Sequence, residues 1–297
     1  MVRIYLLMVD KNMIKVEDAK LNQCHDITNF LIKQFKENSS AFKNIFRFYK
    51  LFNLKEISLY PPGYVLKKNT EIVGFLGILS HKHTKHRDIW ILNMTSWIVS
   101  EEMKANGLKL LIRLIKNKNC LISNFSSSFR AEKILIAAGF SIIDSCELLV
   151  STYKYFFNGI IKSSNLLFDE EAIDSIENIR ERKVFQDHYS IGCKVFSLTF
   201  NEKKMAFIFL NCKDFYQFIH STDLDMMQSK KLWQKICFIL MIHYRVLKIR
   251  VDSRFLSKSI KAKKISSKKM LLFGNIKGYN KISRIYSEPL HKYGNYG

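Results

Sequence analysis

A lysine and a glycine just before a predicted helix form a segment whose residue types suit phosphate binding. The segment reads Val99-Ser100-Glu101-Glu102-Met103-Lys104-Ala105-Asn106-Gly107-Leu108-Lys109. N–H groups at the amino end of a helix, together with the helix dipole, attract anions. Gly107 permits close approach to the backbone, and Lys104 adds a compact positive charge. An ordinary turn between a strand and a helix has similar residues, so the segment alone leaves both interpretations open.

A second polar run follows the next predicted strand. It reads Ser123-Asn124-Phe125-Ser126-Ser127-Ser128. A hydroxyl such as that of Ser126 can donate a proton, and the amide of Asn124 can hydrogen-bond an extended ligand. Serines before a helix are also its usual caps, and Ser126 or Ser127 suits that role. Catalysis and capping are therefore competing interpretations.

Three histidines, His81, His83 and His86, lie in one polar loop. No cysteine or carboxylate pair stands beside them at ligand spacing, and the neighbouring Lys and Arg residues repel cations. We interpret the segment as a solvated hairpin loop and predict no metal site. Contact with an anionic ligand is the alternative.

Hydrophobic spacing predicts the elements that position these segments. A helix is expected from Ile14 to about Tyr49, with Asp26 as a cap. A hairpin turn is expected at 68–71, and the following order is β-β-β-α-β-α-β. The expected strands are 64–67, 72–79, 89–99, 120–125 and 139–150, and the expected helices are 106–115 and 128–138. We predict a mixed α/β fold.

The second half of the chain repeats this order in a degraded form. Strands are expected at 194–200, 205–210, 215–222 and 246–251, with a helix at 230–243. Aligning the sequence with itself so that Phe129 matches Phe255 also matches Leu114 with Leu240. This alignment needs no gap between the helix and the next strand. We interpret this as an internal duplication with a hinge at 151–169.

The segment from Ile57 to Val150 resembles the GNAT family of N-acyltransferases. Val99 to Lys109 matches V-x-P-x-x-[RQ]-x-x-G-x-[GA] at the Val, the basic position and the first Gly, although Glu101 replaces Pro and Lys109 replaces the last small residue. Residues 131–140, AEKILIAAGF, match A-x-x-L-Y-x-x-x-G-F. The Tyr of that motif, often the general acid, falls on Leu135, which cannot transfer a proton.

The resemblance implies a GNAT-like fold with two halves and an acyl-CoA cosubstrate, without a metal. It places CoA contacts at Ile98, Val99, Lys104, Ala105, Asn106, Gly107, Lys109 and Asn124. Asn124 and Ser126 are the tentative catalytic residues. We expect residues 1–155 to form the acyl-CoA-binding domain and 165–297 to form the degenerate or acceptor-binding domain.

Three residues of the second half bear on its function. The alignment places Trp233 where Gly107 stands, so its bulk is expected to exclude the pyrophosphate. Only the first half is therefore expected to bind CoA. Asp223 and Asp252 are interpreted either as acceptor-binding carboxylates or a base, or as caps and turn residues.

The composition fits a folded basic protein. Of 297 residues, 48 are Lys or Arg and 26 are Asp or Glu, giving a net charge of +22. Such a charge attracts polyanions when it gathers on one face, whereas scattered lysines reflect a generally basic surface. Six widely spaced cysteines suit a reducing compartment, and no segment resembles a leader or a membrane span. We expect a cytoplasmic protein without stable membrane insertion.

Three functions are compatible with these features. The first is acyl-CoA-dependent N-acyl transfer to an unknown amine, such as a cell-surface sugar or a peptidoglycan precursor. The second is a catalytically silent GNAT-fold protein that binds CoA or a partner, which Leu135 favours. The third is a basic nucleic-acid-binding protein; a donor such as aminoacyl-tRNA would also suit the charge.

Overall fold

The computed structural model describes residues 14–35, 60–82, 89–125, 127–143, 146–155, 165–190, 192–212, 214–266 and 270–274. These residues form two seven-stranded mixed sheets with helices, as the predicted α/β class requires. The chain divides into two compact units. One holds the first four strands, the start of the fifth and their helices up to residue 122, and the other holds almost all later residues.

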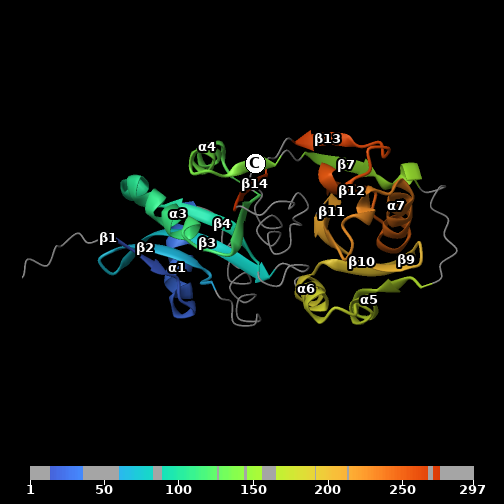
Figure 1. The fold of residues 1–297 in the computed structure, drawn as a ribbon, viewed down its shortest axis with the longest axis horizontal. Helices are drawn as coiled ribbons and strands as arrows, with labels where there is room; N and C mark the ends of the chain where they lie inside the picture. Colours follow the sequence, from blue (N-terminus) through green and yellow to red (C-terminus); the bar gives the residue numbers. More distant parts are fainter. Residues whose placement is uncertain are drawn as a thin grey trace, which may run out of the picture. The chain divides into compact units, whose positions relative to one another are not determined.

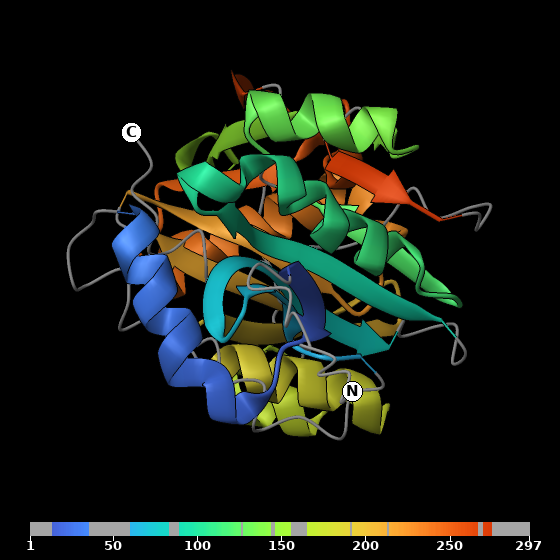
Figure 2. The same ribbon diagram turned by 90° about the vertical axis from the view of Figure 1, so that its left-hand side faces the viewer.

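The first sheet has the strand order β1-β2-β3-β4-β5-β14-β6. Helices α1 (Cys24–Phe35) and α3 (Gly107–Ile115) flank its first strands, α1 in blue and α3 in green-blue (Figures 1 and 2). Leu110, Leu111 and Leu114 form the buried face of α3. The strands are β1 (Ile14–Asp18), β2 (Gly63–Lys68), β3 (Glu71–Lys82), β4 (Trp90–Val99), β5 (Cys120–Asn124), β6 (Ser141–Ile143) and β14 (Met270–Phe273). The short helices are η1 (Leu21–Gln23) and η2 (Glu101–Asn106), and α4 spans Phe129–Ala137.

The predicted hairpin is confirmed, but the predicted N-terminal helix is partly wrong. Strands β2 and β3 pair antiparallel, and Asn69 takes a left-handed φ of 57° in their turn. Ile14–Asp18 is a strand paired with β2, and only α1 is helical between Ile14 and Phe35 apart from the short η1. Asp26 lies in the first turn of α1 instead of capping it. Residues 36–49 lie outside the described part of the chain.

The second sheet has the strand order β13-β7-β12-β11-β10-β9-β8. Helices α5 (Asp169–Asp174) and α6 (Ile179–Ser190) lie on one side of β9 and β10, and α7 (Lys230–Tyr244) lies on the other (Figure 1). The strands are β7 (Glu147–Ser151), β8 (Leu167–Phe168), β9 (Lys194–Phe200), β10 (Lys203–Cys212), β11 (Phe215–Ser221), β12 (Lys248–Asp252) and β13 (Lys263–Ser266). The short helices are η3 (Thr152–Tyr155), η4 (Met226–Gln228) and η5 (Ser253–Phe255).

The core of the second sheet lies between its strands and α7. Phe196, Phe207, Phe209 and Phe218 project from successive strands onto this face, where Trp233 of α7 is fully buried. The pairs Phe196 with Phe207 and Phe209 with Phe218 are direct cross-strand partners. Alternating side chains therefore give one strongly aromatic face, which explains why these strands were predictable.

One strand, β14, pairs far from its place in the sequence, whereas the second sheet is built from the continuous stretch 147–266. The strand predicted at 139–150 is two strands instead: β6 belongs to the first sheet and β7 to the second. At the other end of the chain, β14 pairs with β6 in the first sheet. The single long strand was a wrong prediction. The domain limits 1–155 and 165–297 stay predictions, and β7 and β14 each pair across them.

The two sheets repeat one strand order, in agreement with the predicted duplication. Read from β1 and from β8, the orders coincide position by position, with β14 and β7 at equivalent places. The gapless alignment of the helix and the next strand stays a prediction. It places the buried residues of α3, which are Gly107, Leu110, Leu111 and Leu114, on Trp233, Ile236, Cys237 and Leu240, which are buried in α7.

Candidate functional site

The pairing of β4 with β3 contains a register shift near the end of β4. This shift determines which backbone N–H groups of β4 face β3. The pairing shifts between Leu76 and Ile78, and Gly77 leaves room there for the Thr95 side chain. Beyond the shift Val99 faces Gly74, and the Ser100 N–H donates to Val73 O at 2.9 Å. In antiparallel pairing this directs the Ile98 N–H toward β3 and the Val99 N–H toward the opposite side of β4, where β5 is the neighbouring strand.

Gly107 is favoured by the close packing against Val99 and not by its backbone angles. Gly107 is buried and has an ordinary helical φ of −57°. A Cβ added there would lie 3.1 Å from Val99 Cγ2, and the Trp97 indole N–H donates to Gly107 O at 3.3 Å. A larger residue would therefore require the Val99 side chain or the helix start to shift by a few tenths of an ångström.

The helical segment after β4 begins without a side-chain cap. Ser100 precedes η2 and Asn106 precedes α3, and neither side chain makes a capping hydrogen bond. The first N–H groups of a helix have no intrahelical acceptor, so they need a side chain, water or a ligand. The sequence predicted the anion at the start of the helix expected from residue 106, so the uncapped start of η2 lies upstream of that place within the same segment.

The charges on this segment are mixed. The Lys104 ammonium forms an ion pair with the Glu101 carboxylate, and both side chains are exposed. Glu102 adds a second acidic group in the first turn. Ala105 and Lys109 are also exposed, while Asn106 is half-buried and its amide contacts Met103 Sδ. An anion that approaches Lys104 must therefore compete with Glu101.

The second predicted segment is only partly described. Asn124 ends β5 and is 5% exposed, whereas Ser126 lies outside the described residues. The cap of α4 is Ser128, whose Oγ accepts from Ala131 N at 3.3 Å, so Ser127, one of the two predicted caps, is not the cap. Leu135 is fully buried, which makes it a packing residue.

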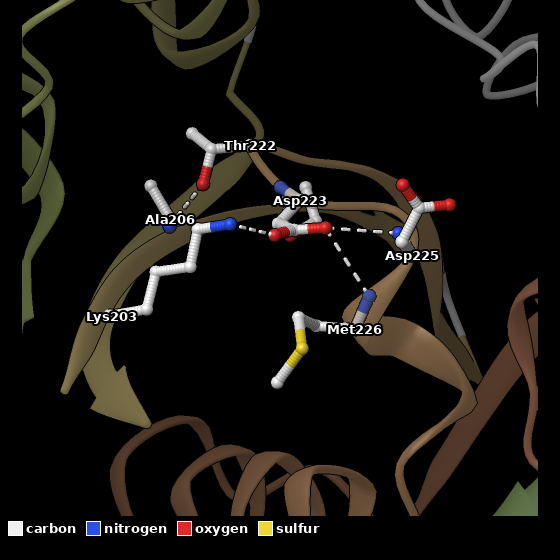
Figure 3. A network of polar contacts seen from close by, with 7 residues as sticks. Lys203, Ala206, Thr222, Asp223, Asp225 and Met226 are labelled. Atoms are coloured by element: carbon white, nitrogen blue, oxygen red, sulfur yellow. Dashed lines mark hydrogen bonds and ion pairs between the residues drawn. The ribbon is translucent and has the colours of Figure 1, made fainter. Parts of the chain in front are cut away.

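In the second unit, the loop after β11 has backbone N–H groups that are capped by a carboxylate of the same loop (Figure 3). Asp223 Oδ1 accepts from Asp225 N at 3.0 Å and from Met226 N at 3.2 Å, and Oδ2 is paired with Lys203. Burial raises the pKa of Asp223, but the hydrogen bonds from Lys203 and Met226 outweigh it, so its pKa lies below the usual value. This agrees with the capping role that was one of the two sequence-based interpretations of Asp223.

Asp252 is likewise engaged within its own segment. Its Oδ1 accepts from Arg254 N at 3.0 Å, and its Oδ2 accepts from the Arg254 guanidinium at 2.7 Å. The buried Trp233 side chain links two nearby segments, because its indole N–H donates to Met227 O at 2.7 Å and to Phe255 O at 3.0 Å. For both aspartates the structure favours the predicted capping role over acceptor binding.

The histidine loop contributes little to the described site. His81 is buried at the end of β3, and residues 83–88 lie outside the described part of the chain. Within the described residues, no cluster of His, Cys, Asp and Glu could hold a metal ion. No helix among them is long and apolar enough to cross a membrane.

Comparison with known proteins identifies the fold. No protein-family model and no curated protein sequence matches the chain. A GCN5-related N-acetyltransferase from Anabaena variabilis is similar over 88% of this chain and 72% of its own, with a TM-score of 0.56 and 12% identity. One from Kribbella flavida covers 89% and 71%, with a TM-score of 0.60 and 8% identity. A putative acetyltransferase from Pyrococcus horikoshii covers 92% of both chains, with a TM-score of 0.52 and 11% identity. The chain therefore has the GNAT fold.

Proposed function

We propose that the protein is an acyl-CoA-dependent N-acyltransferase with one CoA site, formed by the end of β4 and the start of η2 and α3. The GNAT fold, the buried Gly107 and the Val99 N–H that does not face β3 support this proposal. The contacts inferred from the resemblance, from Ile98 to Lys109 together with Asn124, are part of it. So are the cytoplasmic location and an amine acceptor such as a sugar or a peptidoglycan precursor.

The observation that carries the proposal is the contrast between the two equivalent loops. In the first unit the helical segment after β4 has no side-chain cap. In the second, Asp223 accepts from two loop N–H groups and Ser229 Oγ accepts from Leu232 N at 3.3 Å. A pyrophosphate needs these N–H groups as donors. We therefore assign CoA to the first unit alone, as the sequence predicted.

The chemistry follows from the orientation of the backbone. The acceptor nitrogen attacks the thioester carbonyl carbon, the C–S bond breaks, and the proton lost by the nitrogen is needed by the thiolate. We assign the Val99 N–H, which does not face β3, as the donor to the carbonyl oxygen as negative charge develops there. Leu135 cannot supply the proton, so Asn124 and Ser126 stay the proposed polar groups for the leaving sulfur.

The charges of η2 provide a direct test. Replacing Glu101→Gln frees Lys104 and removes a repulsive carboxylate, so we expect acetyl-CoA to bind about 2- to 5-fold more tightly. Lys104→Gln should weaken binding by a similar factor. The matched control is Lys230→Gln, at the start of α7, which should leave the dissociation constant unchanged.

A gain in affinity cannot result from misfolding, which makes Glu101→Gln the decisive variant. Isothermal titration of the three variants measures the effect. Equal affinities for all of them would mean that the pyrophosphate does not lie at η2.

A catalytically silent CoA-binding protein is the second candidate, and buried Leu135 favours it. The two functions differ in turnover and not in binding. Release of free CoA thiol in the presence of a panel of amines would establish the transferase. Tight binding without thiol release from any amine would favour the silent protein.

A further inference from the structure

Four exposed lysines of the second unit gather at one end of strands β7, β12 and β13. We call this group the basic rim; it consists of Lys154, Lys248, Lys261 and Lys263. They come from three segments that are distant in sequence, 151–155, 246–249 and 261–264. None of these segments contains Asp or Glu.

Hydrogen bonds hold the first two segments together. Ser151 of β7 pairs with Lys248 of β12. The next residue, Thr152, donates from its N–H to Leu247 O at 3.0 Å and from its hydroxyl to Val246 O at 2.6 Å. Lys154 follows on the same short helix, η3. Lys154 and Lys248 are thus held on adjoining backbones.

Tyr155 fixes the third segment to the other two. Its hydroxyl accepts from Lys261 N at 2.7 Å and donates to Lys261 O at 3.3 Å. Lys263 then pairs with Leu149 of β7. Lys261 lies two residues before the start of β13, so Lys261 and Lys263 place two exposed charges close together in sequence on this segment.

Exposed apolar groups lie among these lysines. The side chain of Tyr153 is 58% exposed and that of Leu247 is 62% exposed. Tyr153 lies next to Lys154, and Leu247 lies next to Lys248. The rim therefore offers cations together with an aromatic face that is not packed into the core.

We propose that the basic rim binds a single-stranded segment of nucleic acid. Its lysines would neutralise successive phosphates, and the ring of Tyr153 would stack on a base. An anionic membrane also attracts lysines, but membrane-surface segments concentrate their apolar residues on one face of a helix. Here the apolar side chains are single and come from two different segments. This binding is independent of acyl transfer.

The test compares two triple variants of the full chain that carry the same change in charge. The rim variant is Lys248→Gln, Lys261→Gln and Lys263→Gln. The control is Lys204→Gln, Lys230→Gln and Lys231→Gln, which are exposed lysines of the same unit. Fluorescence anisotropy with a short labelled single-stranded RNA gives the association constant at a series of salt concentrations. Thermal unfolding verifies that both variants are folded.

We expect the rim variant to lose at least about 10-fold in affinity and its salt slope to fall by about 2, because each phosphate contact contributes about 0.7. The control should bind nearly as the wild type does. Tyr153→Ala should weaken binding about 5- to 100-fold without changing the salt slope.

Two results would overturn the proposal. Equal losses in both triple variants would mean that total charge and not the rim attracts the RNA. Binding to phosphatidylserine vesicles but not to RNA, lost only in the rim variant, would assign the rim to a membrane surface.

Discussion

Asp223 illustrates how one side chain decides what a loop can bind. Its carboxylate accepts from the backbone of Asp225 and Met226, and the Lys203 ammonium neutralises it. At the equivalent place in the first unit, Glu101 points to Lys104 and leaves the helical segment without a side-chain cap. Two acidic residues at similar positions therefore have opposite consequences for anion binding.

The Asp223 carboxylate also predicts a pH dependence of stability. Because its pKa in the folded protein lies below the usual value of 3.8, its contribution is present above about pH 4 and is lost as pH falls through the folded pKa. Replacing Asp223→Ala should lower the free energy of unfolding by about 1–2 kcal/mol at pH 7. Urea unfolding at pH 7 and at pH 3 should give a smaller difference at pH 3. A difference that does not change with pH would contradict the assigned hydrogen bonds.

At the scale of elements, the end of α7 carries a conformational cost. Arg245 terminates the helix with a left-handed φ of 54° and ψ of 36°, a conformation that favours glycine. Arg245→Gly should raise the free energy of unfolding by about 0.5–1 kcal/mol, because it removes the Cβ clash. Arg245→Ala is the control, since it removes the charge but keeps the Cβ. Chemical denaturation of both variants distinguishes the two effects, and equal stabilisation by Ala would attribute the gain to charge.

The elements found from the sequence are those with long apolar runs. The hairpin of β2 and β3 and helix α7 have enough buried residues for their periodicity to stand out. Strand β1 was missed because its five residues, with only partial burial at Ile14 and Val16, give a weak alternation. Strand β14 has four residues, and its partners lie far away in the sequence. Local patterns do not encode such pairing.

The same distinction applies to the candidate site. Gly107 was found because glycine at a helix start is a local signal, and the structure explains it by the close approach of Val99. The role of Asp223 depends on Lys203 in the preceding hairpin and on the fold of the loop. Spacing alone left it open as a base, a ligand for an acceptor or a cap.

At the scale of the whole molecule, the position of β14 predicts that the first sheet depends on residues 270–273 as well as on its earlier strands. Leu271 of β14 is fully buried, and Leu271→Ala should cost about 2–5 kcal/mol. Its effect on hydrogen exchange should appear in β6 and β5 of the first sheet. The matched variant Val150→Ala, in β7, should instead loosen β12 and β13. Exchange that stays unchanged in β5 and β6 of Leu271→Ala, or in β12 and β13 of Val150→Ala, would contradict the strand order.

The central claim is that a duplicated fold keeps one CoA site, in its first unit. Calorimetric titration of the full chain with acetyl-CoA tests this most directly, because it gives a stoichiometry as well as an affinity. We predict one acetyl-CoA per chain, displaced by desulfo-CoA and tightened by Glu101→Gln. Two molecules per chain, or no binding at all, would contradict the account.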